Sequence, residues 1–433
     1  MRVGVLGGGA LGLTAAYRVA RAGHHAVVLE RDRLLGGLAG SFEVGGNHLE
    51  KFYHHLFKTD RVIVDLIEEV GLKDKLYWGR PKTSNLIGGK PYQLDSATSV
   101  LKFTPLSPLA RIQLGMGVAI LKALPSQEPL EGQTTASWTR RWMGAAAYRV
   151  VWEPLLKAKF GAYYDQIAAP WFWSRIHCRT SSLGYMRGGF HQLYSRLGER
   201  IVEMGSEIRL GQEVVEVAGA PDGKVQVKVR TPDGERDEEF DSVIATLPTR
   251  LFLKLAKGLP EAYRERYDFG DHYGAHCAIL ALDRQLLTDN TYWLSVNDPG
   301  YPFLAAVEHT NFIPPEEYDG LRLVYLGNYL PMSNPLYSQT DDEVIARFLP
   351  HLRRLNPAFD ESWVKQTFVF KAPFAQPIVT VDFHEHIPPL ETPIPGLFLA
   401  NMFQVYPQDR GQNYSVKLGD EVASLVSDRA SKP

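Results

Sequence analysis

The apolar positions at the start of the chain predict a strand, a tight glycine turn and a helix. Residues 3–6 form a short apolar run that leads straight into Gly7-Gly8-Gly9, and apolar residues then recur at helical spacing from Leu11 onward. A second apolar run at residues 26–29 ends in Glu30. Because a crossover between parallel strands is right-handed, these segments predict a β-α-β unit with adjacent parallel strands.

The pattern changes repeatedly along the chain, which predicts two interleaved domains. Strand–helix alternation is lost from about residue 76, where Trp, Tyr and Pro become frequent, and it returns near Gly188. The aromatic-rich character resumes from about residue 262 to 384. We expect an α/β protein with a Rossmann-like nucleotide-binding domain interleaved with an α+β substrate-binding domain. The first domain would comprise residues 1–75, 183–261 and 385–433, and the second would comprise residues 76–182 and 262–384.

Composition narrows the class of protein. The chain has 433 residues, of which 45% are hydrophobic and 22% charged, and its formal net charge is −2. This balance is typical of soluble globular proteins and gives no reason to expect a nucleic-acid partner. Cys178 and Cys277 are the only cysteines, too few for a four-cysteine zinc site. His54 and His55 lack the spacing of metal ligands, so we expect no metal. The N-terminus does not resemble a signal peptide, which makes the cytoplasm the expected location.

One long apolar stretch allows two interpretations. Residues 101–124 contain an apolar helix pattern between Pro108 and Pro125 that Arg111 and Lys122 interrupt. It is shorter than the roughly 20 apolar residues that a membrane-spanning helix needs. The stretch is therefore either a buried or groove-lining helix or a peripheral contact with a membrane surface. The oligomeric state stays open.

The glycine turn has the spacing of a dinucleotide site. In Gly7-x-Gly9-x-x-Gly12 the first glycine permits the turn, the second admits a pyrophosphate, and the third lets strand and helix pack closely. The helix N-terminus at Ala10 and Leu11 offers free N–H groups to phosphate. Glu30 stands where a carboxylate accepts hydrogen bonds from the adenosine ribose, and it would repel the 2′-phosphate of NADP.

The residues that follow Glu30 identify the nucleotide. The stretch Asp32-Arg33-Leu34-Leu35-Gly36-Gly37-Leu38 resembles the second FAD motif of the superfamily of amine oxidases, protoporphyrinogen oxidases and phytoene desaturases. The resemblance implies a flavoprotein in which the glycine pair passes close to the FAD diphosphate and ribityl chain. From this element it implies cofactor contacts at Arg31, Arg33, Gly36, Gly37 and Leu38.

Later stretches are similar to the same superfamily in order and spacing. Val215 lies in a segment that resembles the adenine-side strand, where backbone groups contact the base. The C-terminal element begins with a strand that ends at Asn401, and its helix begins near Tyr414, Ser415 and Val416. The resemblance implies that this helix N-terminus meets the isoalloxazine ring, where it would stabilise negative charge.

Three side chains are candidates for catalysis. Many amine oxidases of the superfamily place a lysine near flavin N5, and the matching position here holds His276. A histidine there would shuttle a proton, or it is an ordinary strand residue. Arg410 lies with Asp409 in the loop that leads to Tyr414, and Arg410 would bind a polar or anionic substrate end or simply pair with Asp409.

The resemblance implies one leading function and two rivals. The leading function is an FAD-dependent oxidase or dehydrogenase that moves hydride from a hydrophobic or partly hydrophobic small molecule to flavin N5. The aromatic residues of the inserted stretches would line its cavity or form core. The first rival resembles UDP-galactopyranose mutase, which uses flavin without net redox change; two or more arginines facing the cavity would favour it, and Arg410 alone is insufficient. The second rival is a binding protein of the GDP-dissociation-inhibitor type, against which the intact glycine motifs argue.

Overall fold

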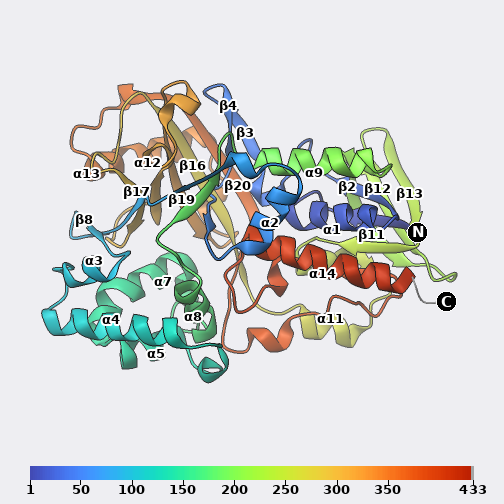
Figure 1. Ribbon diagram of the computed structural model, residues 1–433, viewed down its shortest axis with the longest axis horizontal. Coiled ribbons are helices and arrows are strands. Elements are labelled where there is room, and N and C mark those ends of the chain that lie inside the picture. The colour runs from blue at the N-terminus through green and yellow to red at the C-terminus, as the bar shows by residue number, and fades with distance from the viewer. Residues whose placement is uncertain (431–433) are drawn as a thin grey trace.

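The computed structural model describes residues 1–430 as two lobes joined side by side (Figure 1). The lobe that holds both termini is built on a five-stranded parallel sheet with strand order β10-β2-β1-β14-β21. Its strands are β1 (Arg2–Leu6), β2 (His25–Glu30), β10 (Glu207–Leu210), β14 (Ser242–Ala245) and β21 (Leu397–Leu399). We call it the nucleotide lobe.

The predicted β-α-β unit forms the centre of this sheet. β1 pairs in parallel with β2, with Val5 opposite Val28, and both side chains are fully buried. α1 (Ala10–Arg21) connects the two strands and packs between α9 (His191–Glu203) and α14 (Gln412–Ala430), as Figure 1 shows. The predicted α/β fold class is confirmed.

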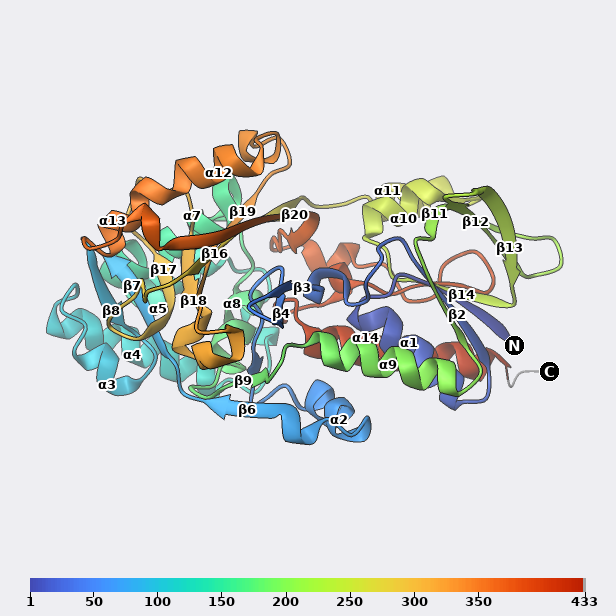
Figure 2. The ribbon, with the colours of Figure 1, turned by 90° about the horizontal axis from the view of Figure 1, so that it is seen from above.

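The second lobe contains a seven-stranded sheet with strand order β20-β16-β19-β18-β17-β7-β8, seen on the left of Figure 2. Two chain segments far apart in sequence build it, because β7 pairs in parallel with β17. The strands are β7 (Lys82–Ile87), β8 (Lys90–Gln93), β16 (His272–Leu282), β17 (Thr291–Val296), β18 (Ala305–Glu308), β19 (Arg322–Leu330) and β20 (Val364–Pro377). We call this part the second lobe; the exact domain boundaries stay predictions.

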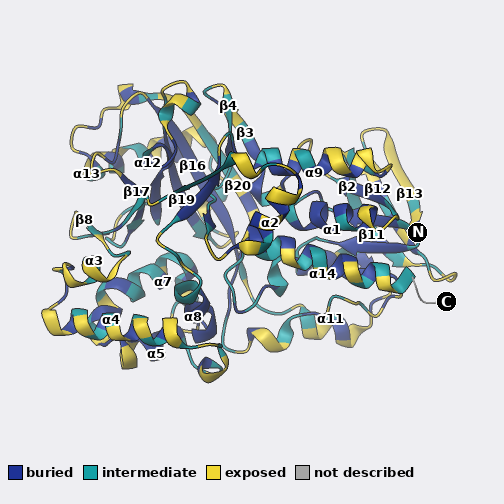
Figure 3. Cartoon of the chain, in the orientation of Figure 1, coloured by how far each residue is buried: buried dark blue, intermediate teal, exposed yellow. Residues whose placement is uncertain are grey.

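Helices cover the second lobe on two sides. α12 (Asp341–Phe348) and α13 (Leu352–Leu355) lie on one face of the sheet, where Leu280 and Leu326 pack against Phe348 in a shared core. A helical layer with its own core lies at the other end of the lobe (Figure 3). It contains α3 (Ala97–Leu101), α4 (Pro108–Ala123), α5 (Thr135–Trp142), α7 (Glu153–Phe160) and α8 (Ala169–His177).

Three smaller sheets and the remaining helices complete the chain. β11 (Glu213–Gly219) starts a four-stranded sheet with β12 (Val225–Thr231), β13 (Gly234–Phe240) and β15 (Ala256–Lys257), while β3 (Ser41–Val44) pairs with β4 (Asn47–Glu50). β9 (Leu183–Met186) lies between β5 (Leu56–Phe57) and β6 (Leu76–Gly79). The other main helices are α2 (Arg61–Glu69), α10 (Thr249–Leu255) and α11 (Glu261–Tyr267). Within residues 1–430, no helix has the length and apolar character needed to cross a membrane.

Candidate flavin and substrate site

The first glycine turn connects β1 to α1 with a backbone that only glycine tolerates. Gly7 has φ of 114°, and a Cβ atom on it would lie 2.4 Å from Thr246 Oγ1. A Cβ atom on Gly12 would lie 2.0 Å from the carbonyl oxygen of Gly7, which is backbone and cannot move aside. α1 begins at Ala10 with Gly9 as its N-cap and without a side-chain cap. The first N–H groups of α1, including those of Ala10 and Leu11, therefore suit a phosphate.

The second glycine pair lies directly against the first. The Gly36 N–H donates to the carbonyl of Gly8 at 2.8 Å, and a Cβ atom on Gly37 would lie 3.2 Å from Gly9 Cα. Gly36 and Gly37 have φ of 118° and 57°. Arg31 and Arg33 beside this loop are exposed. Two bare glycine loops thus lie side by side at the N-terminus of α1, as a diphosphate requires.

Glu30 and Val215 lie at the far side of the same turn. The Glu30 carboxylate accepts hydrogen bonds from the Gly8 N–H at 2.6 Å and from the Asp32 N–H at 2.7 Å. The Glu30 carbonyl accepts from the Gln212 N–H at 2.8 Å, which brings the start of β11 alongside β2. The ladder between β11 and β12 shifts register at Val215, so its backbone is released from regular pairing. These positions suit the ribose and adenine ends of the nucleotide.

The C-terminal helix α14 packs beside the same glycine turn. A Cβ atom on Gly419 of α14 would lie 2.8 Å from the carbonyl of Leu11, so α14 packs tightly against the first turns of α1. Tyr414, Ser415 and Val416 belong to the first turn of α14, as predicted, and Val416 is buried. Burial, followed by a neighbouring Cys178, raises the pKa of Tyr414.

Asn401 has a structural position at the end of β21. Its Nδ2 donates to the Leu247 carbonyl at 2.8 Å, and its Oδ1 accepts from the Phe403 N–H at 2.9 Å. The side chain therefore joins the ends of β14 and β21, the edge of the parallel sheet at which ligands bind in this class of fold.

The structure places His276 away from these loops. On β16, Ala275 packs near Leu38, while the His276 ring faces Phe348 of α12 at 6.2 Å between centroids. His276 is 0% exposed, and burial lowers its pKa to about 4. The expected role of His276 as a proton shuttle beside the flavin loses its geometric basis, because adjacent strand residues point to opposite faces of a sheet.

Arg410 belongs to a charged cluster that the sequence did not reveal. Asp409 pairs with Lys159 of α7 at 2.8 Å and with Arg175 of α8 at 2.7 Å, and its other oxygen lies 3.6 Å from Arg410. Arg179 follows α8, and its charge interacts with that of Arg175. We call Lys159, Arg175, Arg179 and Arg410 the basic cluster.

Aromatic side chains surround the basic cluster. The Lys159 ammonium lies 5.1 Å from the Trp171 ring centroid, and the Arg410 guanidinium lies 4.8 Å from that of Tyr329. Tyr329 also packs with Ala275 beside Leu38, which connects the cluster to the second glycine loop. Sequence patterns offered no signal for this grouping, because α7, α8 and the loop before α14 meet only through the tertiary fold.

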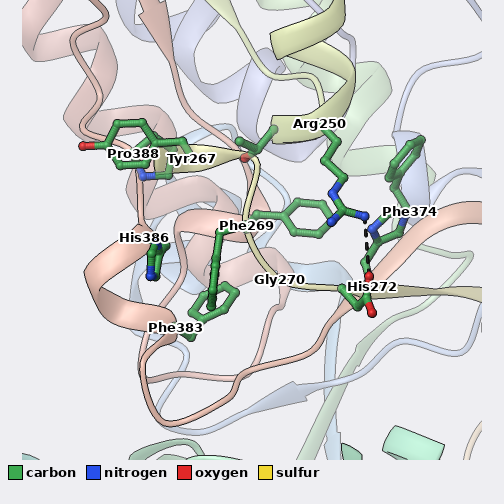
Figure 4. Close-up of a pocket in the computed structure, with 12 residues that line it drawn as sticks. Arg250, Tyr267, Phe269, Gly270, His272, Phe374, Phe383, His386 and Pro388 are labelled. Carbon is green, nitrogen blue, oxygen red and sulfur yellow. Dashed lines mark ion pairs between the residues drawn. The ribbon is translucent and has the colours of Figure 1, made fainter. Parts of the chain in front are cut away.

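A separate small pocket lies near the ends of α10 and β20 (Figure 4). Phe269 and His386 stack with centroids 3.6 Å apart, and Arg250 pairs with Asp271 at 3.5 Å. Thr249, which also lines the pocket, accepts a hydrogen bond from Asn401 at 3.2 Å. None of the residues that we expected to hold cofactor lines this pocket.

Comparisons with known proteins agree with this geometry. The family described as flavin containing amine oxidoreductase matches residues 12–407. A 15-cis-phytoene desaturase of Synechococcus elongatus is 21% identical, over 92% of this chain and 90% of its own. The protoporphyrinogen oxidase 1 of Spinacia oleracea chloroplasts is also 21% identical, over 60% of this chain and 52% of its own.

Solved structures show the same fold. A putative protoporphyrinogen oxidase from Exiguobacterium superimposes with a TM-score of 0.79 at 21% identity and covers 99% of both chains. A reduced UDP-galactopyranose mutase gives a TM-score of 0.75 at 14% identity, covering 100% of this chain and 96% of the other. At these identities the likeness shows the fold alone.

The cofactor of the family fits the residues present. Close contacts at Gly7, Gly12 and Gly37 leave little room for Cβ atoms in the two adjoining glycine loops, whose bare backbone at the N-terminus of α1 suits a diphosphate. Glu30 and Val215 lie where the nucleoside end would reach. The chain belongs to the flavin containing amine oxidoreductase family and is an FAD-dependent oxidoreductase.

Proposed function

We propose that this enzyme removes hydride from a C–H bond of a hydrophobic or partly hydrophobic small molecule held between the two lobes. When bound, FAD supplies the hydride acceptor at its N5 position. The two glycine loops, Glu30 and the N-terminus of α14 would hold the cofactor. The residues of β16 and β20 that face these loops would hold the substrate.

One observation carries this proposal. The small side chains of Ala275 on β16 and of Ala372 and Ala375 on β20 pack against Leu38, which directly follows the second glycine pair. Phe52 and Tyr329 border the same group. The second lobe therefore presents small and aromatic side chains to the loop that would hold the cofactor, as a site for a largely apolar substrate requires.

The test is an anaerobic screen of the holoenzyme against hydrophobic candidates that carry an oxidisable C–H bond. We expect at least one candidate to bleach the visible flavin band. The reaction should yield one equivalent of a product that contains two fewer hydrogen atoms than that candidate. Conversion of a candidate by the oxidised enzyme while the flavin stays yellow would argue against hydride removal.

The non-redox rival gains support from the basic cluster. Two or more arginines at the cavity would favour a mutase-like enzyme. Arg175 and Arg410 both lie beside Asp409, and the charge of Arg179 interacts with that of Arg175. The discriminating experiment is turnover of nucleotide-sugar substrates without an electron acceptor after a single chemical reduction of the enzyme. Sustained turnover would favour this rival over net oxidation.

We also propose that α4 rests on an anionic membrane surface. Leu109, Ile112 and Met116 repeat on one face of α4 and are 76%, 52% and 54% exposed. Leu101 on the neighbouring α3 and Trp142 on the neighbouring α5 are also exposed, and exposed residues recur along these helices in Figure 3. Exposed basic residues on the same helical layer complement anionic headgroups: Lys102, Arg140 and Arg141.

Co-sedimentation with vesicles tests the membrane contact. We expect the protein to sediment with phosphatidylcholine vesicles that contain phosphatidylglycerol, and Ile112→Glu to abolish this. Met332→Glu, which changes an exposed apolar residue outside the helical layer, is the matched control. Equal sedimentation of Ile112→Glu and the control would contradict the contact.

A further inference from the structure

The basic cluster carries more positive charge than its protein partners neutralise. Asp409 is the carboxylate that pairs with Lys159, Arg175 and Arg410. Arg179 is attracted by Asp95 through longer-range electrostatics, and within residues 1–430 its guanidinium takes part in no hydrogen bond or ion pair. Four cations thus face two carboxylates.

Neighbouring histidines do not change this balance. Burial, assisted by the charge of Arg410, lowers the pKa of His54 to about 4, and burial followed by the charge of Arg179 lowers the pKa of His55 to about 3. Both rings are therefore neutral at pH 7 and add no charge. Although burial opposes it, Lys159 and Arg175 hold the pKa of Asp409 below its usual range, so its carboxylate stays charged.

The positive charge that the carboxylates leave unneutralised favours the binding of an anion. Cations that leave water lose hydration, and their mutual repulsion adds to that cost unless a negative group lies between them. Burial first, and then the neighbouring charges of Arg175 and Arg410, lower the pKa of Lys159. The side chain of Arg175 is 38% exposed and Arg179 is exposed, so a ligand from solvent can reach them.

The surroundings define the rest of the ligand. Arg175 and Lys159 share the Trp171 ring, and Arg410 stacks over Tyr329. Tyr329 in turn packs beside Ala275 next to Leu38. An anionic group at the cluster would therefore continue along aromatic side chains toward the cofactor loop.

We propose that the basic cluster binds a carboxylate or phosphate group of the substrate, and that the substrate is an organic anion with an apolar or aromatic body. This proposal rests on the proposed function, because both place the substrate between the two lobes. It excludes a simple alkylamine as the preferred substrate, because the cluster repels an ammonium group.

Binding of small amphiphiles to the holoenzyme tests the inference without turnover. Calorimetric titrations would use octanoate, octyl phosphate and octylamine, which share one chain and differ in charge. We expect at least one of the two anions to bind about tenfold more tightly than octylamine, since a charge-assisted hydrogen bond contributes on this scale. The tighter of the two anions identifies the group as carboxylate or phosphate.

Two variants and a control locate the binding. Arg179→Gln removes a guanidinium that has no hydrogen bond or ion pair within residues 1–430, and it should weaken binding of the anion about tenfold. Asp409→Asn removes the central negative charge and should tighten binding. Arg347→Gln, on the exposed side of α12, is the control and should leave affinity within about twofold. Arg179→Gln is expected to fold, because it removes no hydrogen bond or ion pair.

The outcomes separate this inference from the proposed function. Equal affinity for octylamine and both anions, or an unchanged affinity in Arg179→Gln, would overturn the anion site. Tight anion binding by an enzyme whose flavin no substrate reduces would instead leave the site intact and overturn hydride removal.

Discussion

At the scale of single residues, the first glycine turn depends on contacts that an added Cβ atom would block. A Cβ atom on Gly7 would meet the Thr246 side chain, and one on Gly12 would meet the Gly7 carbonyl oxygen. The spacing of the motif made these glycines identifiable from the sequence. Arg175 and Arg179 gave no such signal, since a solitary arginine at the end of a helix is common on any protein surface.

Gly12→Ala should produce a protein that fails to retain flavin. The added Cβ atom would lie 2.0 Å from the Gly7 carbonyl oxygen, so the turn must open and the phosphate contacts are lost. The ratio of visible flavin absorbance to protein absorbance after purification measures this. Gly115→Ala is the matched control, because its Cβ atom would have 4.0 Å to its nearest neighbour, and it should stabilise α4 by about 0.5–1 kcal/mol. Full flavin content in Gly12→Ala would contradict the assignment.

Anion affinity should fall as pH rises through neutrality. Burial, together with the charges of Arg175 and Arg410, lowers the pKa of Lys159 to about 7. A cation with a lowered pKa is charged below that value and neutral above it, so the cluster loses one positive charge between about pH 6 and 8. Titration of octanoate, whose charge is constant there, should show affinity about tenfold weaker at the higher pH. Lys159→Arg stays charged and should give a flat profile; a wild-type profile equally flat would count against Lys159 in the cluster.

At the scale of elements, β16 shows where sequence reasoning fails. Its existence as a strand was predictable, but a displacement of one residue exchanges the two faces of a strand. His276 matches the position of the lysine that many amine oxidases place near flavin N5. In the structure, however, the neighbouring Ala275 is the residue that packs near Leu38. Nothing in the local sequence distinguishes these faces, since both sides of β16 are buried.

His276→Leu should leave the rate of flavin reduction unchanged. A neutral buried ring is replaced by an apolar side chain of similar size, so the free energy of unfolding should change by less than about 1.5 kcal/mol. Ala275→Leu, one residue away but facing the cofactor loop, should slow reduction. Rapid mixing under anaerobic conditions measures both rates. Slow reduction in His276→Leu with normal reduction in Ala275→Leu would restore His276 to the site.

At the scale of the whole molecule, the interleaving of the chain was predictable from composition, but the pairing of its segments was not. The loss and return of strand–helix alternation indicated two interleaved domains. The parallel pairing of β7 with β17 joins residues about two hundred positions apart, and it depends on packing that no local pattern encodes. The basic cluster likewise joins segments far apart in sequence, because Asp409 pairs with Lys159 of α7 and Arg175 of α8.

The most direct test of the account is anaerobic single-turnover reduction of the flavin by a substrate identified in the screen, with its transferred hydrogen as protium or deuterium. If the enzyme removes hydride, the visible flavin band bleaches and deuterium slows the bleaching. One equivalent of a product with two fewer hydrogen atoms than the substrate then forms. Formation of product at an unchanged oxidation state, with the flavin band intact, would contradict hydride removal.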